Sequence, residues 1–240
     1  MSLLSTEGLT KHFGGVAAVE DLALAVEAGE VFGLIGPNGS GKTTALNMLS
    51  GFLAPDRGRA WLGDEEVTRL KPAALARRGL LRMFQMTRVF PRTCAFDNLL
   101  TAGLARGLTE AEATRRAGAL IEELTLEPVR YLDAGQLSGG QRKLLEFGMC
   151  FMEPPRIALL DEPFAAVHPL MRETMARFIR SRNERGHTFL VVSHDMPIVV
   201  ELCHRAACMN AGRLIAVGPT REVLKDPGVI EAYLGSGAHA

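Results

Sequence analysis

The sequence has no excess of either charge and no long apolar run. Lysine plus arginine total 27, aspartate plus glutamate also total 27, and the formal net charge is zero. A neutral chain has no overall field to attract nucleic acid or anionic lipid, so we expect no nucleic-acid partner. No apolar run approaches the ~20 residues that span a bilayer, and residues 1–10 lack the cationic and apolar segments of a signal peptide. We therefore expect a cytoplasmic chain that is soluble by itself.

Cysteine is also scarce. The four cysteines (Cys94, Cys150, Cys203 and Cys208) include no C-x-x-C pair and show no spacing typical of a zinc site or of a small disulfide scaffold. We expect reduced thiols that are mostly packed. With 240 residues, of which 47% are hydrophobic and 22% charged, the chain is globular and long enough for one large domain or for a domain with an insertion.

Three short apolar runs predict the centre of the fold. Residues 31–35, 157–160 and 189–192 lack polar alternation, which is typical of parallel strands buried on both faces. A polar motif follows each run. Ligands of open α/β sheets bind beyond the carboxyl ends of the strands, so we expect these motifs to converge on one crevice.

The flanking segments differ from this pattern. Leu22, Leu24 and Val26 alternate with polar residues and predict an antiparallel edge, and residues 61–65 resemble a hairpin. Between residues 87 and 155 the pattern is helical, with a capping box expected at 109–112. We predict one α/β domain over 1–240, with 1–86 and 156–240 forming the core and its β edge, and with 87–155 as an inserted helical subdomain.

The most specific motif matches the phosphate-loop pattern G-x-x-x-x-G-K-[ST]. Its residues are Gly36, Pro37, Asn38, Gly39, Ser40, Gly41, Lys42, Thr43 and Thr44. The glycines let backbone N–H groups face phosphate oxygens, and the helix expected near Lys42 adds the positive end of its dipole. We expect Lys42 to contact the β- and γ-phosphates of ATP, and the Thr43 hydroxyl to bind Mg²⁺. A plain glycine-rich turn is the alternative.

Further polar residues follow the buried runs. We expect Asp161 to bind Mg²⁺, because a carboxylate at the end of a buried strand needs a cation or hydrogen bonds, and Glu162 to act as general base on the attacking water. The alternative is a surface Asp-Glu pair. His194 would donate to the γ-phosphate, and Gln85 would contact Mg²⁺ or water; alone, each residue is a weak signal.

A second anion-binding helix start is expected at residues 137–141. The Ser138 hydroxyl and the amides of Gly139 and Gly140 precede a helical pattern that begins near Gln141. One nucleotide hardly needs two such cradles. An N-cap without a ligand is the alternative.

Together these motifs resemble the ATP-binding cassette (ABC) family over nearly the whole chain. The resemblance implies a P-loop NTPase (RecA-like) core, with Gln85 as the Q-loop residue, 137–141 as the signature and His194 as the switch histidine. It also implies a head-to-tail dimer with an identical or paralogous cassette, in which Ser138 and Gly140 complete the partner's site, and coupling to membrane permeases. Phe13 lies where the family places a ring against adenine, although a core phenylalanine is the alternative.

Within the family the chain resembles the larger ATPase of branched-chain amino acid importers. The residues concerned are 13–15, 84–85, 88–91, 194–196 and 229–235. This subgroup implies a place on the inner face of the cell membrane and an indirect partner, a solute-binding protein. His168 departs from the Asp or Asn of the family's D-loop, which puts coupling between the two ATP sites in doubt. An ATPase of lipopolysaccharide export, a soluble non-transport cassette and a small-molecule kinase are the alternatives.

Overall fold

A six-stranded sheet forms the centre of the computed structural model, which describes residues 2–84, 87–165 and 167–236. The strand order is β11-β10-β4-β9-β8-β7, and only β11 pairs in the antiparallel direction. The strands are β4 (Val31–Ile35), β7 (Leu80–Met83), β8 (Ile157–Asp161), β9 (Thr188–Val192), β10 (Arg205–Asn210) and β11 (Arg213–Pro219). The predicted parallel strands are thus confirmed.

Both faces of this sheet are buried, as the continuous apolar runs predict. In β8, Ile157 and Leu159 pack into one hydrophobic cluster, while Ala158 and Leu160 pack into a second one on the opposite face. Successive side chains of a strand point to opposite faces, so a strand that is buried on both faces is apolar along most of its length.

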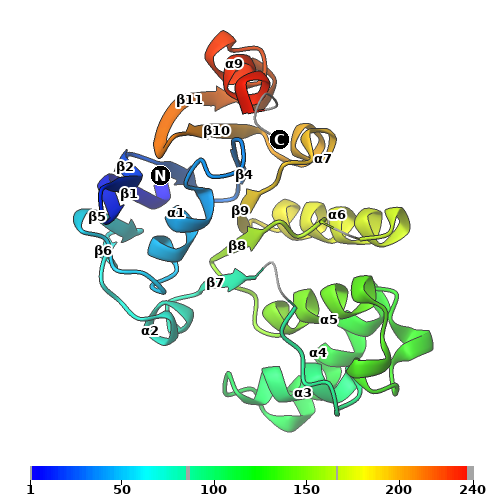
Figure 1. Cartoon of the computed structure of the whole chain (residues 1–240). Helices are drawn as coiled ribbons and strands as arrows, with labels where there is room; N and C mark the ends of the chain where they lie inside the picture. Colours follow the sequence, from blue (N-terminus) through cyan, green and yellow to red (C-terminus); the bar gives the residue numbers. More distant parts are fainter. Residues whose placement is uncertain (1, 85–86, 166, 237–240) are drawn as a thin grey trace.

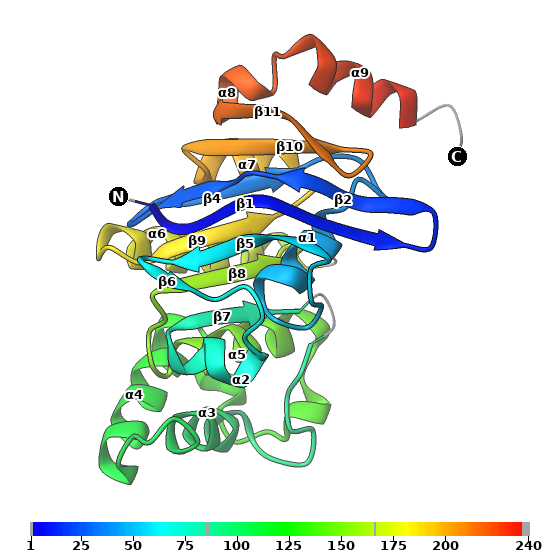
Figure 2. The ribbon, with the colours of Figure 1, turned by 90° about the vertical axis from the view of Figure 1, so that its left-hand side faces the viewer.

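An antiparallel sheet covers one face (Figure 2). It is built on β1 (Ser2–Phe13), which pairs with β2 (Val16–Leu22), β3 (Ala25–Glu27) and β5 (Arg57–Leu62), and β5 pairs with β6 (Glu65–Glu66). The predicted hairpin is confirmed by the pairing of Leu62 with Glu65. Leu22, Leu24 and Val26 are buried with helix α1 (Lys42–Leu49), so the alternating edge is confirmed as well.

Helices cover the other face and both ends (Figure 1). Helices α6 (Pro169–Glu184) and α7 (Met196–Leu202) contribute to the cluster on this face, and α2 (Pro72–Arg77) precedes β7. Helices α8 (Thr220–Val223) and α9 (Pro227–Ser236) lie beside β11 at one end. No helix in the described ranges is long and apolar enough to cross a membrane.

At the other end, beyond β7, a group of helices connects β7 to β8 (Figure 1). They are α3 (Ala95–Leu104), α4 (Glu110–Glu123), two short 3₁₀ turns (Glu127–Val129 and Ala134–Gln136) and α5 (Gly139–Phe151). Thr109 caps α4 by accepting from the Glu112 amide, but the Glu112 carboxylate pairs with Arg116 instead of completing the capping box.

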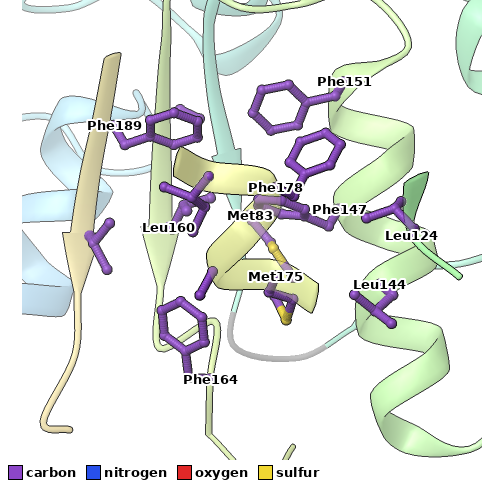
Figure 3. Packing of buried hydrophobic residues seen from close by; sticks show 14 of the residues in the cluster. Met83, Leu124, Leu144, Phe147, Phe151, Leu160, Phe164, Met175, Phe178 and Phe189 are labelled. Atoms are coloured by element: carbon purple, nitrogen blue, oxygen red, sulfur yellow. The ribbon is translucent and has the colours of Figure 1, made fainter. Parts of the chain in front are cut away.

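An aromatic cluster joins α5 to α6 and to the sheet (Figure 3). The ring of Phe147 lies 5.0 Å from that of Phe178, and the ring of Phe151 lies 5.1 Å from Phe178 and 5.8 Å from Phe189. Edge-on and offset pairs at these distances stabilise a core beyond their area burial. These contacts fix helix α5 against α6 and against the face of the central sheet.

Candidate nucleotide site

The polar motifs converge at the carboxyl ends of β4, β8 and β9, as the sequence predicts. They line a cavity of about 630 Å³. Its lining includes Asn38, Gly39, Ser40, Gly41, Lys42, Thr43, Thr44, Asp161, Glu162 and His194, together with Val16, Ala17 and Ala18 of β2. Residues that are distant in sequence therefore share one site.

The loop before α1 adopts a conformation that requires glycine. Gly36 and Gly41 have φ values of 142° and 103°. A Cβ atom would lie 2.1 Å from the Met209 carbonyl oxygen at Gly36 and 2.3 Å from the Ala18 carbonyl oxygen at Gly41. Because these distances are far below contact, the loop depends on both glycines to bend around the helix start.

Lys42 lies inside the loop. Its Nζ donates to the carbonyl oxygens of Gly36 and Pro37 at 2.7 and 2.8 Å, and to Ser40 Oγ at 3.2 Å. Burial lowers the pKa of Lys42, whereas the neighbouring Glu162 acts in the opposite direction. The ammonium group is thus held at the base of the loop, where an incoming phosphate would meet it.

Asp161 has a cationic partner that the sequence did not reveal. Arg82 on β7 donates from Nη2 to Asp161 Oδ2 at 2.8 Å, with both side chains about 5% exposed or less. Arg82 Nη1 also donates to Asn47 Oδ1 and Ser50 Oγ. The expected hydrogen bonding of this buried carboxylate therefore comes from arginine, and the second carboxylate oxygen has no hydrogen bond to a described residue.

Glu162 and His194 lie side by side. His194 Nδ1 is 2.9 Å from Glu162 Oε2, and the histidine side chain is 66% exposed against 14% for the glutamate. Glu162 has φ of 49°, which is unusual for a residue with a side chain. Its amide donates to the Val192 carbonyl oxygen, and its carbonyl oxygen accepts from the Lys143 ammonium on α5 at 3.3 Å. The neighbouring strand and α5 thus hold this backbone in place.

The oxygen ligands present suit Mg²⁺. Thr43 and Asp161 line the same cavity, while no group of three or more His, Cys, Asp or Glu side chains in the described part of the chain could cage a metal. Mg²⁺ is usually bound by one or two protein oxygens, substrate phosphates and water. A hydroxyl and a carboxylate beside a phosphate loop fit that pattern.

The remaining predicted residues lie elsewhere. Phe13, at the end of β1, is 53% exposed, so the core-packing alternative is wrong; the Lys11 ammonium lies 5.9 Å from its ring centroid. Ser138 and Gly139, at the start of α5, are exposed, and neither they nor Gly140 line the cavity. Gln85 lies outside the described residues.

Ser138 and Gln141 form a full capping box. Ser138 Oγ accepts from the Gln141 amide at 3.3 Å, and Gln141 Oε1 accepts from the Ser138 amide at 2.9 Å. The box fixes the exposed start of α5. The expected N-cap is thus present, at a surface where a second molecule has access to it.

A contact from the C-terminal helix was missed by the sequence reasoning. The Gly36 amide donates to the Tyr233 hydroxyl of α9 at 2.7 Å, across 197 residues of sequence. Burial raises the pKa of Tyr233 to about 12. No local pattern signals such a contact, because the tyrosine follows an ordinary helical stretch.

With this geometry established, comparisons with known families and proteins are informative. The family model "ABC transporter" matches residues 19–165, and "Branched-chain amino acid ATP-binding cassette transporter" matches residues 213–239. The chain is 37% identical to the high-affinity branched-chain amino acid transport ATP-binding protein BraF of Pseudomonas aeruginosa, over 97% of this chain and 98% of BraF. It is 36% identical to the lipopolysaccharide export system ATP-binding protein LptB of Escherichia coli strain K12, over 98% of each chain.

Solved structures agree with this assignment. A nucleotide-free ATP-binding cassette from an ABC transporter matches with a TM-score of 0.87 and 32% identity, over 97% of this chain and 99% of that one. The ADP conformation of MJ1267, also a cassette of an ABC transporter, matches with a TM-score of 0.86 and 32% identity, over 98% and 99%. The chain therefore belongs to the ABC transporter family, as an ATPase subunit whose C-terminal segment is of the branched-chain amino acid type.

Proposed function

We propose that the chain hydrolyses ATP to drive the import of branched-chain or other amino acids through membrane permeases. The observation that carries this proposal is the C-terminal segment. It matches the branched-chain amino acid type over residues 213–239, and it contains Tyr233, which contacts the phosphate loop. The segment that matches this family model therefore contacts the first residue of the phosphate loop.

In this proposal Glu162 activates the attacking water. Its carboxylate borders the cavity beside Lys42, and His194 lies within hydrogen-bond distance of it. A general base needs to reach the water directly, and a neighbouring imidazole N–H keeps the carboxylate oriented toward the γ-phosphate. Thr43 and Asp161 would hold Mg²⁺, which neutralises charge on the phosphates. Lys42 would leave its carbonyl partners for the β- and γ-phosphates.

Further residue roles belong to the same proposal. Gln85 would contact Mg²⁺ or the attacking water, and Phe13 would stack on adenine with its exposed ring. Residues 1–86 and 156–240 would act as the ATP-binding core, and 87–155 as the helical insertion.

Cassettes of this family dimerise and partner membrane permeases. For this chain we propose a head-to-tail dimer in which the exposed Ser138 and the half-buried Gly140 reach the partner's phosphates. The complex would lie on the inner face of the membrane and receive cargo from a solute-binding protein.

The permease would dock near the end of β7, around Phe84 and Arg88. Two guanidinium groups contact the Phe84 ring, that of Arg82 at 4.8 Å and that of Arg88 at 4.0 Å from the ring centroid, and the ring of Phe52 meets it edge-on. Phe52 and Phe90 are about half exposed. An aromatic and cationic surface beside the nucleotide site suits a short helix of a permease.

Substitution of Glu162 tests the hydrolytic role. Glu162→Gln should reduce the rate of ATP hydrolysis by at least about a hundredfold, since general-base catalysis contributes 10²–10⁴. ATP binding should persist. Glu222→Gln, at an exposed position on α8, is the matched control and should keep wild-type activity. Equal activity in wild type and Glu162→Gln would refute the assignment.

Docking has its own test. Arg88→Glu should lower amino-acid uptake in cells while ATP binding by the purified chain is unchanged. Arg59→Glu, an equal charge reversal at an exposed position on β5, should spare uptake. Uptake unaffected by Arg88→Glu would remove this surface from the proposal.

Export of lipopolysaccharide is the second candidate, favoured by 36% identity to LptB over nearly the full length. Mass spectrometry of proteins that co-purify with the tagged chain from its own membranes separates the two. Two permeases, a paralogous cassette and a solute-binding protein would support import. Recovery of export components, or of ribosomes without membrane proteins, would overturn it.

A further inference from the structure

The largest cavity of those described lies on the opposite edge of the sheet from the nucleotide site. It has a volume of about 740 Å³ and lies at the amino ends of β7 and β8. It is lined by Ala73, Ala76, Arg77, Arg78, Gly79, Ala105, Arg106, Glu153, Pro154, Pro155 and Arg156. We call it the arginine cavity. Sites for small molecules typically measure ~300–1,000 Å³.

Four guanidinium groups face one carboxylate in this lining. Arg78 donates to Glu65 Oε1 at 2.7 Å, and Arg106 donates to the Glu153 carbonyl oxygen at 2.9 Å. Arg77 and Arg156 make no side-chain hydrogen bond or ion pair with any residue that the structure describes. Two cations are therefore unpaired in a concave, positively charged surface.

The side chain of Arg156 lies against two glycines. A Cβ at Gly79 would lie 2.9 Å from Arg156 Cγ, and a Cβ at Gly63 would lie 3.2 Å from its Nη2. Gly79 and Gly63 thus leave the space that the arginine side chain occupies.

The chemistry of the lining selects the ligand class. The uncharged residues are alanine, proline and glycine, which offer no aromatic surface for a base or a ring. Arginines bind phosphate groups through two parallel N–H donors and relieve their mutual repulsion on a multivalent anion. We propose that the arginine cavity binds a small ligand carrying two or more phosphate groups, separately from the ATP site.

Such a ligand would connect two parts of the molecule. Arg77 belongs to α2, next to the sheet, whereas Arg106 follows α3 in the helical group. Both residues line this cavity. A bound anion would resist relative movement of the helical group and so regulate the ATPase. This inference does not depend on the cargo or on the direction of transport.

Calorimetric titration with inorganic pyrophosphate tests the proposal. The full chain is first saturated with ADP in metal-free buffer, so that the phosphate loop is occupied. We expect pyrophosphate still to bind, and Arg77→Ala and Arg156→Ala each to weaken it roughly tenfold, since charge-assisted bidentate contacts are strong. Citrate at equal ionic strength should bind more weakly than pyrophosphate.

Control variants distinguish binding in the arginine cavity from nonspecific electrostatic attraction and from binding to the phosphate loop. Arg59→Ala and Arg221→Ala remove equal charge from exposed positions outside the cavity and should leave binding within twofold. Binding should survive Lys42→Ala. No binding to the ADP-saturated chain, equal weakening in the control variants, loss with Lys42→Ala, or tighter binding of citrate would each overturn the proposal.

Discussion

The hydrogen bond between the Gly36 amide and the Tyr233 hydroxyl leads to a sharp prediction. Tyr233→Phe removes the hydroxyl oxygen and keeps the aromatic ring at this position of α9. Gly36 is buried, so its N–H would lose its partner away from water. A net hydrogen bond contributes ~0.5–1.5 kcal/mol, and a buried unsatisfied donor costs ~1–3 kcal/mol.

From these values we expect Tyr233→Phe to lower the free energy of unfolding by ~1–2 kcal/mol. For a chain of this size each kcal/mol corresponds to ~2–4 °C in Tm, so the expected fall is ~2–8 °C. Part of the loss should appear at the nucleotide site, because Gly36 opens the phosphate loop. If ~1.4 kcal/mol of this loss fell on the loop conformation that binds ATP, the Kd for ATP would rise about tenfold.

Urea unfolding and fluorescence titration with a labelled ATP analogue measure the two effects. The only other tyrosine supplies a matched control, because Tyr131 is 75% exposed and the same exchange there removes a solvated hydroxyl. Tyr131→Phe should change neither quantity. A Tyr233→Phe variant with wild-type stability and wild-type ATP affinity would refute the reasoning.

Three further variants probe the surroundings of the site. Phe178→Ala should cost ~3–5 kcal/mol of stability in urea unfolding, since it opens a cavity beside the rings of Phe147 and Phe151. A loss below ~1 kcal/mol would contradict this packing. Burial raises the pKa of Glu146 to about 7 from 4.5, so the folded state binds its proton more tightly and stability falls as pH rises from about 4.5 through about 7. Glu146→Gln should therefore gain stability relative to wild type toward pH 8 but not near pH 4, and a constant difference would exclude this titration. Lys143 donates to the carbonyl oxygens of Glu162 and Ala165, so Lys143→Met should lower the ATPase rate more than Lys143→Arg; equal rates in the two variants would deny Lys143 a positioning role.

The sequence predicted those parts of the site that depend on local pattern. The strand 31–35 was predictable because a strand that is buried on both faces has a continuous apolar sequence. The loop 36–44 was predictable because phosphate binding requires its glycines and its lysine at a fixed spacing. The Arg82–Asp161 pair was not predictable, because it exists only where β7 and β8 are neighbours in the sheet. Tyr233 likewise reaches Gly36 only after the whole sheet has formed. The exposure of Phe13 was not predictable either, because it depends on how far the end of the β1–β2 hairpin extends from the rest of the sheet.

The strand order also has a consequence for synthesis on the ribosome. β4, which carries the phosphate loop, lies between β9 and β10, and both come from the last third of the chain. During synthesis the whole phosphate-loop sequence is therefore made long before the two strands that flank β4. A chain that ends before Arg205 lacks β10, so β4 would be without one of its two neighbouring strands.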